Sequence, residues 1–268
     1  MPAVPAAPAP PPPPVLALRG VSKRFGAVQA LTDVELEVHA AEVLALVGDN
    51  GAGKSTLVKT IAGVHPVDGG VIEWDGVPVS LDRPHDAQNL GIATVYQDLA
   101  LCDNLDVVGN LHLGREIRRY GLLDEVAMER RARELLRTLA IRIPSVRIPV
   151  ASLSGGQRQT VAIARSLLGE PRLVILDEPT AALGVEQTAQ VLDLVERLRE
   201  RGHATILISH NMADVRAVAD RVAVLRLGRN NGVFEVRSTS QEEIISAITG
   251  ATENAVTRRA ARTAEGRQ

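Results

Sequence analysis

The stretch from Gly48 to Thr56, which reads Gly-Asp-Asn-Gly-Ala-Gly-Lys-Ser-Thr, constrains the fold of this chain more than any other. It follows the apolar run 43–47 and precedes residues 57–61, whose apolar side chains recur at helical spacing. The pattern predicts a strand, a glycine-rich turn and a helix. In such a turn small residues let successive backbone N–H groups point at phosphate oxygens, and the helix presents its positive end there.

Two side chains of this turn suit nucleotide chemistry. Lys54 is expected to reach the outer phosphates, and Ser55 to place its hydroxyl on the Mg²⁺ ion that a nucleotide brings. The remaining candidate nucleotide ligands belong to the same stretch: Gly48, Asn50, Gly51, Ala52, Gly53 and Thr56. A glycine-rich turn beside a solvated lysine is the alternative interpretation. We disfavour it because the chain has only three lysines, and one of them stands at the required position.

Composition limits the classes of protein that fit. With 268 residues, 45 % of them hydrophobic, the chain suffices for one large domain or for one domain with a subdomain. A net charge of −2 and 2 % aromatic residues do not supply the basic face or the stacking rings that nucleic-acid binding uses. We therefore expect no nucleic acid as a partner. Cys102 is the single cysteine and can form no internal disulfide, so we interpret it as structural.

The chain is expected to form one domain between two tails. Residues 1–14 are rich in Pro and Ala, which favours extended polyproline conformation, and residues 250–268 show no periodicity. The folded domain is expected over 15–249. No apolar run approaches the roughly 20 residues that span a bilayer, and no signal pattern opens the chain. We expect the chain to stay in the cytoplasm and to act at a membrane only through a partner.

Alternating patterns predict antiparallel strands on both sides of the central motif. Val34–Val38 places three apolar residues on one face, as in a half-buried strand of an N-terminal β layer. Residues 71–74, followed by Asp75-Gly76, predict a hairpin. Residues 222–236 predict a second hairpin around Asn231-Gly232, because that dipeptide favours tight turns.

From about residue 98 to 168 the pattern changes to helix, which predicts a helical subdomain inserted in an α/β core. An apolar stripe runs along part of it: Met128, Ala132, Leu135, Leu136 and Leu139. The exit contains Leu153–Gln157, where Ser154 is placed as an N-cap and Gly155 and Gly156 bare the first amides of a helix. This is a second candidate phosphate site. A plain capped helix start is the alternative.

Two carboxylates come directly after the continuous apolar run 173–176, which is typical of a buried parallel strand. In open α/β sheets, polar residues at the carboxyl ends of strands face the ligand crevice. Asp177 is therefore expected to hold Mg²⁺, and Glu178 to take a proton from water. Bare surface acids are the alternative interpretation.

Two further polar side chains end strands of the predicted core. Gln97 ends the apolar strand 91–97 and is expected to reach the metal or the attacking water. His210 follows the strand 205–208 and is expected at the same edge of the sheet. A solvated loop glutamine and a structural histidine are the alternatives.

Together, and in this order, these elements resemble the ATP-binding-cassette (ABC) ATPases over roughly residues 15 to 248. The matching motifs are Walker A at Gly48–Thr56, the Q-loop glutamine at Gln97, the signature at Leu153–Gln157, Walker B with its following glutamate at Leu173–Glu178, and the switch histidine at His210. The resemblance implies an α/β fold, namely a P-loop NTPase (RecA-like) core with an N-terminal antiparallel β layer and an inserted α-helical subdomain. It implies ATP hydrolysis with Mg²⁺, and it implies that Phe25 stacks on adenine; core packing is the alternative for Phe25.

Three stretches narrow the resemblance to the carbohydrate-uptake ABC ATPases of bacteria that serve ribose, xylose, fructose and similar monosaccharides: 103–108, 113–116 and 181–184. An importer ATPase for a monosaccharide is then implied, with transmembrane permease subunits as partners and a sugar-binding protein as an indirect one. The implied location is the cytoplasmic face of the inner membrane. Soluble ABC ATPases that act on ribosomes or DNA, and exporter ATPases, are the alternatives.

The family's arrangement is a head-to-tail homodimer, in which each signature covers the partner's Walker A. It implies that one copy holds the γ-phosphate and Mg²⁺ with Lys54, Ser55, Asp177 and Gln97, and the other with its signature residues, Ser154, Gly155, Gly156 and Gln157. Glu178 would activate water while His210 orients it or the γ-phosphate. Two departures are visible. Many carbohydrate ATPases carry two cassettes where this chain has one, and Gly184 replaces a frequent aspartate.

The segment 98–108 holds more apolar side chains than an exposed loop needs. In ABC importers the corresponding region forms a groove that receives a short cytoplasmic helix of the permease. The resemblance therefore places a coupling contact here, with Leu101 and Leu105 as its expected anchors. Packing within the helical subdomain is the alternative for both leucines.

Overall fold

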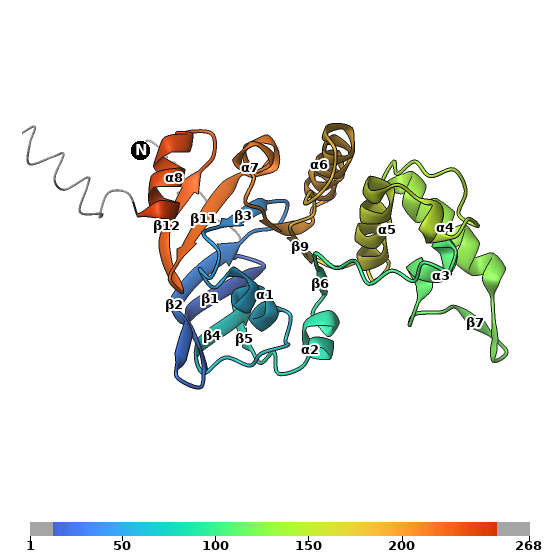
Figure 1. Cartoon of the computed structure of the whole chain (residues 1–268). Helices are drawn as coiled ribbons and strands as arrows, with labels where there is room; N and C mark the ends of the chain where they lie inside the picture. Colours follow the sequence, from blue (N-terminus) through green and yellow to red (C-terminus); the bar gives the residue numbers. More distant parts are fainter. Residues whose placement is uncertain (1–12, 251–268) are drawn as a thin grey trace, which may run out of the picture.

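A computed structural model describes residues 13–250. Its N-terminal layer is an antiparallel sheet with strand order β2-β1-β4-β5, shown in Figure 1. The strands are β1 (Leu16–Phe25), β2 (Val28–Val38), β4 (Gly69–Trp74) and β5 (Val77–Val79). The predicted alternation of Val34–Val38 and the hairpin after residue 74 are both confirmed, because β1 pairs antiparallel with β2 and β4 with β5.

The second sheet carries the glycine-rich turn. Its strand order is β12-β11-β3-β10-β9-β6, and only β12 runs antiparallel to its neighbour. The strands are β3 (Val43–Val47), β6 (Ile92–Val95), β9 (Leu173–Asp177), β10 (Ala204–Ile208), β11 (Arg221–Arg226) and β12 (Arg229–Glu235). The carboxyl ends of the parallel strands therefore meet at one edge, where ligands bind in sheets of this kind.

Helices cover this sheet and form a separate group beyond β6. They are α1 (Lys54–Ile61), α2 (Pro84–Asn89), α3 (Val107–His112), α4 (Glu125–Thr138), α5 (Gly155–Leu167), α6 (Val185–Glu200), α7 (Met212–Val218) and α8 (Gln241–Thr249). A 3₁₀ turn spans Val150–Ser152. Among residues 13–250, no helix combines the length and the apolar character needed to cross a bilayer.

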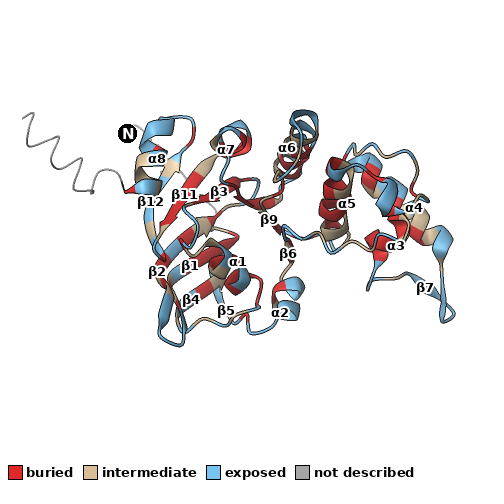
Figure 2. Cartoon of the chain, in the orientation of Figure 1, coloured by how far each residue is buried: buried red, intermediate tan, exposed pale blue. Residues whose placement is uncertain are grey.

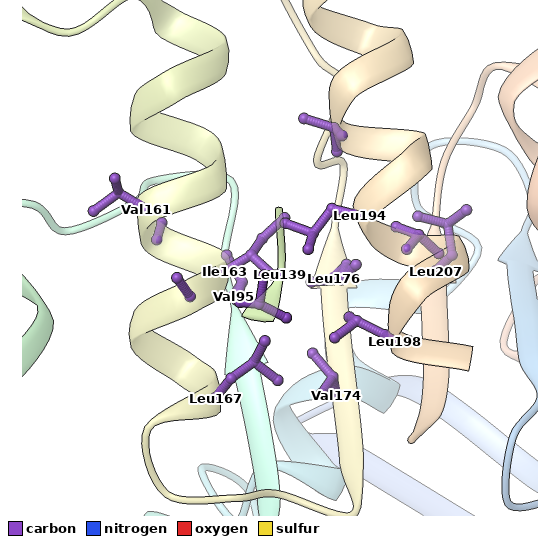
Figure 3. Close-up of a cluster of buried hydrophobic side chains, with 14 of the residues drawn as sticks. Val95, Leu139, Val161, Ile163, Leu167, Val174, Leu176, Leu194, Leu198 and Leu207 are labelled. Atoms are coloured by element: carbon purple, nitrogen blue, oxygen red, sulfur yellow. The ribbon is translucent and has the colours of Figure 1, made fainter. Parts of the chain in front are cut away.

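The parallel strands divide their side chains between two cores, as the period of two in a strand requires. In β9, Val174 and Leu176 face one core, while Leu173 and Ile175 face the other. The second core lies against α1 and the antiparallel sheet. Figure 3 shows the first core, where α5 and α6 meet β6 and β9. Figure 2 shows the resulting buried strands between more exposed outer surfaces. Burial on both faces explains why 173–176 is continuously apolar.

The group formed by α3, α4 and α5 is the helical subdomain of the predicted fold class, at one end of the molecule in Figure 1. The apolar stripe packs inward: Met128, Ala132 and Leu136 are buried on α4, and Leu139 just after it. Sequence periodicity missed a small hairpin between α3 and α4, made of β7 (Arg118–Arg119) and β8 (Leu122–Leu123). It also missed α8.

The second predicted hairpin exists, but its predicted turn was wrong. β11 and β12 pair up to Arg226↔Arg229, so the turn is Leu227-Gly228, with φ of 49° and 76°. Asn231-Gly232 lies inside β12 instead, where Asn231 Nδ2 donates to the Ala247 carbonyl at 2.6 Å. The reason is tertiary: the Gly228 amide donates to the Ala52 carbonyl, and the Gly228 carbonyl accepts from the Thr32 amide, so distant segments hold the turn at Leu227-Gly228. The chain therefore turns before it reaches the local turn signal.

Most of the two predicted tails, 1–14 and 250–268, lies outside the described residues. The boundaries proposed for the domain and its subdomain therefore remain predictions.

Candidate functional site

A cavity of about 940 Å³ lies where the glycine-rich turn meets the carboxyl ends of β6, β9 and β10. The whole of Gly48–Thr56 lines it. So do the predicted polar residues from the ends of the strands: Gln97, Asp177, Glu178 and His210. The topology thus gathers, in one cavity, residues that lie far apart along the sequence.

The turn around the cavity needs its glycines. Gly48 has a φ of 152°, and a Cβ there would lie 2.1 Å from the Leu225 carbonyl oxygen. Gly53 has a φ of 104°, and its Cβ would lie 2.9 Å from the Ala30 carbonyl oxygen. Both positions are therefore closed to other residues by backbone contacts. Lys54 Nζ donates to the carbonyls of Gly48 and Asp49, at 2.6 and 3.0 Å, so its ammonium lies within the turn.

A turn from the far end of the chain supports this loop. The Gly228 amide donates to the Ala52 carbonyl at 2.9 Å, and the Thr32 amide donates to the Gly228 carbonyl at 2.8 Å. Leu227 and Gly228 also line the cavity, as do Val28, Gln29 and Ala30. Sequence reasoning missed these residues. Leu227 and Gly228 were missed because the hairpin turn was predicted at the wrong position. Val28 could have been predicted, because it lies only three residues after Phe25.

The acidic pair stands where β9 ends. Asp177 is half-buried, and burial, together with the neighbouring Glu178 carboxylate, raises the pKa of Asp177, while Lys54 and Lys59 oppose the rise. Glu178 adopts a left-handed backbone conformation with a φ of 50°, and its amide donates to the Ile208 carbonyl at 3.0 Å. An acid held beside a cavity and poorly solvated suits proton transfer or cation binding.

The predicted histidine contacts this acid directly. His210 Nδ1 lies 2.8 Å from Glu178 Oε2, and the His210 side chain is 75 % exposed, so its ring is open to a ligand in the cavity. Glu178 is only 17 % exposed. The pair therefore combines a shielded carboxylate with an accessible imidazole, an arrangement suited to activating water and orienting its target.

Phe25 lies apart from the residues that line the cavity. Phe25 is 42 % exposed, and its ring packs edge-on against the His65 ring, with 5.0 Å between the ring centroids. Lys23 Nζ lies 5.5 Å from the centre of the Phe25 ring and is held there by Asp68 at 2.9 Å. The core-packing alternative does not fit such exposure. The structure thus leaves this ring available on the surface, three residues before Val28, which does line the cavity.

The signature residues also lie away from the first cavity. Ser154 caps α5: its Oγ accepts from the Gln157 amide at 3.3 Å, and the Ser154 amide donates to Gln157 Oε1 at 3.0 Å. Gly156 is buried against α6, where a Cβ would lie 2.8 Å from the Gln187 side chain. Ser154 and Gln157 line a different cavity, of about 600 Å³. The predicted cap is confirmed, but one chain does not bring this helix end to the glycine-rich turn.

A third cavity, of about 550 Å³, lies between β6, α2 and α5. Tyr96, Leu99 and Leu113 line it, and Arg165 donates to the Leu99 and Ala100 carbonyls at 2.7 Å each. Burial lowers the pKa of Arg165. The two leucines expected to anchor a partner here, Leu101 and Leu105, do not line this cavity. Leu101 packs against the hydrophobic core instead, as its alternative interpretation had it.

Oxygen donors near the glycine-rich turn fit a hard cation. Within the described part of the chain, no group of three or more His, Cys, Asp or Glu side chains is arranged to hold a metal ion by itself. The first cavity does gather a hydroxyl, a carboxylate and an amide, from Ser55, Asp177 and Gln97. Mg²⁺ prefers one or two protein oxygens together with substrate phosphates and water, so this donor set fits Mg²⁺ that arrives with a nucleotide.

A glycine-rich turn between β3 and α1, facing a carboxylate pair at the end of β9, defines the class of P-loop nucleotide hydrolases. Comparison with known proteins narrows the class. The family described as "ABC transporter" matches residues 31–181. The chain belongs to this family, and with it to the ATP-binding-cassette ATPases.

Curated relatives match over most of the chain. A fructose import ATP-binding protein of Rhizobium meliloti is 44 % identical over 247 residues, which cover 89 % of this chain and 95 % of that protein. A xylose/arabinose import ATP-binding protein of Sulfolobus acidocaldarius is 43 % identical and covers 88 % and 94 %. A ribose import ATP-binding protein of Rubrobacter xylanophilus is 44 % identical over 88 % of this chain but 47 % of its own length, so the chain spans about half of that relative.

Solved structures agree with the fold class. An ATP-binding cassette of an ABC transporter has a TM-score of 0.77 and is 24 % identical, over 87 % of this chain and 98 % of that one. A second ATP-binding cassette, described as a dimeric post-hydrolysis state bound to ADP and Pi, has a TM-score of 0.69 and is 25 % identical, over 84 % and 100 %. The predicted P-loop core with an antiparallel layer and a helical subdomain is confirmed.

Proposed function

We propose that this chain is the ATP-binding and ATP-hydrolysing subunit of a membrane importer for a monosaccharide. One observation carries the proposal: the cavity that gathers Lys54, Asp177 and Glu178 belongs to a chain that is 43–44 % identical to ATP-binding proteins of fructose, xylose/arabinose and ribose import. Ribosome, DNA and export functions have no comparable support among these relatives.

ATP is expected to bind with its phosphates along the glycine-rich turn. The backbone amides of Gly51–Thr56 and the ammonium of Lys54 would contact the phosphates. The Lys54 ammonium would leave the carbonyls of Gly48 and Asp49 and donate to phosphate oxygens instead, which makes a charge-assisted hydrogen bond. Phe25 would stack on adenine, because it is exposed and its ring packs edge-on against His65.

Mg²⁺, when bound with ATP, would neutralise phosphate charge in the transition state. Ser55, Asp177 and Gln97 are the residues that would hold it. A bound cation would also oppose the burial and the repulsion from Glu178 that raise the pKa of Asp177. Glu178 would accept a proton from the attacking water, and His210, 2.8 Å from Glu178, would orient the water or the γ-phosphate.

A second copy of the chain would complete the site. Ser154, Gly155, Gly156 and Gln157 stand at the start of α5, outside the cavity that holds Lys54 and Glu178. A two-fold, head-to-tail pair would bring the α5 start of each copy to the phosphates held by the other. The dimeric cassette among the structural relatives supports this proposal. ATP would then bridge two copies, and hydrolysis would loosen them.

The permease is expected to contact the cavity between β6, α2 and α5. Leu113 is 46 % exposed there, and the cavity begins next to Gln97, so a partner segment in it would sense the state of the γ-phosphate. Through the permease the chain would act at the cytoplasmic face of the inner membrane, with a sugar-binding protein as an indirect partner.

Sugar uptake tests the whole proposal. A host strain without the chain is compared with the strain complemented by the parent sequence and by Lys54→Ala, using labelled ribose, xylose and fructose. We expect uptake of at least one monosaccharide to be lost, and to return only with the parent sequence. Unchanged uptake of every monosaccharide tested would contradict import of a monosaccharide.

Leu113→Glu tests the permease contact, with Val77→Glu as its control because Val77 is 61 % exposed on β5, away from the cavity. We expect Leu113→Glu to abolish uptake while the ATPase rate and melting temperature of the isolated chain stay at the parent values. Normal uptake in this variant would remove the contact from this cavity.

A further inference from the structure

The segments that follow β9 and β10 leave the second sheet side by side, at the edge where the parallel strands end. β9 pairs in parallel with β10 up to Asp177↔Ile208, and the Glu178 amide donates to the Ile208 carbonyl as the last backbone bond between them. Beyond this bond, one segment runs through Glu178 into a turn, and the other runs through His210 into α7. The sheet itself therefore no longer fixes how Glu178 and His210 face each other.

The turn at Glu178 is conformationally costly. Glu178 has a φ of 50°, and left-handed backbone is unfavourable for a residue with a side chain. The Ala181 amide donates to the Glu178 carbonyl at 3.1 Å and closes the turn. A strained conformation persists only where the surrounding contacts hold it, so the contacts of this turn decide the direction of the Glu178 side chain.

One buried carboxylate holds both segments. Asp214, in the first turn of α7, is only 5 % exposed. Its Oδ2 accepts from the Thr180 hydroxyl at 2.6 Å, and its Oδ1 accepts from Asn211 Nδ2 at 3.0 Å. Thr180 follows Glu178 by two residues, and Asn211 follows His210 directly. Thr180, Asn211 and Asp214 do not line the first cavity, where ATP is expected to bind. Contact with ATP therefore does not explain why these three side chains are hydrogen-bonded to one another.

We propose that Thr180 and Asp214 are positioning residues for hydrolysis, which hold Glu178 and His210 at their working separation of 2.8 Å. The proposal rests on the roles proposed above for Glu178 and His210. A buried carboxylate whose two oxygens each accept a hydrogen bond is a rigid link. Small misplacement of reacting groups has large kinetic effects, up to about 10²-fold for about 1 Å.

The pair should therefore affect turnover and not ATP binding. The phosphates are expected on the glycine-rich turn and α1, and the hydrogen bonds of Thr180 and Asp214 described above involve neither of them. A purely structural clamp would instead lower the melting temperature and every kinetic constant together. The ratio between the change in kcat and the change in KM separates the two roles.

Thr180→Val is the test variant, because valine keeps the shape and removes the hydroxyl. Thr180→Ser keeps the hydroxyl and serves as the rescue. Thr205→Val is the matched control: Thr205 is fully buried on neighbouring β10, and its hydroxyl has no hydrogen-bond partner within the described residues. Each variant of the full chain is measured with Mg·ATP for kcat and KM, by calorimetry for ATP affinity, and for melting temperature.

We expect kcat to fall about tenfold or more in Thr180→Val, with KM and ATP affinity within about twofold of the parent. Thr180→Ser and Thr205→Val should keep the parent kcat. Asp214→Asn, which replaces one acceptor oxygen by a donor, should repeat the loss and serves as the second variant if Thr180→Val does not fold. A parent kcat in Thr180→Val, a parallel loss of kcat and ATP affinity, or failure of serine to rescue would each overturn the proposal.

Glu178→Gln, measured in parallel, separates this inference from the proposed function. If Glu178→Gln turns over at the parent rate, the base assignment fails, and the positioning role fails with it. If Glu178→Gln is inactive while Thr180→Val keeps the parent rate, only the positioning role fails.

Discussion

Small residues surround the starts of two helices that are both linked to phosphate binding, α1 and α5, yet their first turns differ. α1 begins after Gly53, which is in the left-handed region and provides no side-chain cap. α5 begins after Ser154, and a closed capping box with Gln157 satisfies its first turn. The first helix start lines the large cavity, whereas the second does not.

This difference indicates separate roles for the two helix starts: one binds ATP, and the other completes the ATP site of a second copy. Because no side chain caps α1, its amides are open to an anion. At α5, the Ser154 oxygen already accepts a hydrogen bond from the Gln157 amide, but a serine hydroxyl still has its own proton to donate. The capping box thus fixes the direction of a donor. We infer that α1 binds ATP within one copy, and that α5 recognises ATP already bound to another copy.

Replacing the proposed base should give the largest effect, a loss of turnover. The substitution leaves both helix starts intact, so ATP binding should not change. In Glu178→Gln we expect turnover to fall by about 10²–10⁴-fold, the usual loss for a general base, while ATP still binds. Steady-state ATPase assays and calorimetry measure the two quantities. A parent rate of hydrolysis would show that Glu178 is not the base.

A change at α1 should act on affinity. Lys54→Ala removes a charge-assisted contact to phosphate, and such contacts are worth about 1.5–3 kcal/mol, so ATP should bind roughly 10- to 100-fold more weakly. Lys59→Ala, on the exposed side of the same helix, is the control and should bind ATP like the parent. Equal ATP affinity of Lys54→Ala and the parent in calorimetry would remove Lys54 from the site.

A change at α5 should act on turnover without affecting ATP binding to the single copy. Ser154→Ala removes the cap and the donor; we expect about 1 kcal/mol less stability and several-fold slower hydrolysis. Ser152→Ala is the control, since Ser152 also donates one hydrogen bond, to the Pro149 carbonyl at 2.7 Å, two residues before the cap. If Ser154→Ala weakened ATP binding as much as Lys54→Ala, the two helix starts would not differ as proposed.

The charge of Asp177 should give the smallest effect, measured as the stability of the chain without nucleotide. Burial and Glu178 raise the pKa of Asp177 in the folded chain, so its ionised form at neutral pH costs folding free energy. Nucleotide-free Asp177→Asn should therefore melt at a higher temperature than the parent at pH 7. The gap should begin to close as the pH falls through the raised pKa of Asp177 in the folded chain, and it should vanish below the pKa of Asp177 in the unfolded chain, where both states of the parent carry the proton. Thermal denaturation across pH measures it, and a gap that did not change with pH would contradict the electrostatic cause.

Much of the fold was predictable because its signals are local and periodic. The continuous run of β9, the alternation of β2 and the stripe of α4 each follow from which faces are buried. The residues of the first cavity were predictable for a related reason: the ends of parallel strands meet at one edge, so Asp177, Glu178 and His210 had to lie together.

The rest depends on contacts between distant segments. The turn at Leu227-Gly228 was missed because the hydrogen bonds that hold Gly228 come from Thr32 and Ala52, which lie far away in the sequence. The bond from Thr180 to Asp214 joins residues 34 positions apart, and neither type of residue is unusual in its own segment. The exposed hairpin β7–β8 is only two residues long on each strand, too short for periodicity to show.

The most direct test of the central claim is the association state of Glu178→Gln with ATP. The site is proposed to be complete only when α5 of a second copy reaches phosphates held at α1, so ATP that is bound but not hydrolysed should hold two copies together. Sedimentation velocity of this variant should show a dimer with Mg·ATP and a monomer with Mg·ADP, and adding Ser154→Ala should weaken the dimer. A Glu178→Gln chain that binds Mg·ATP and remains monomeric would contradict the claim.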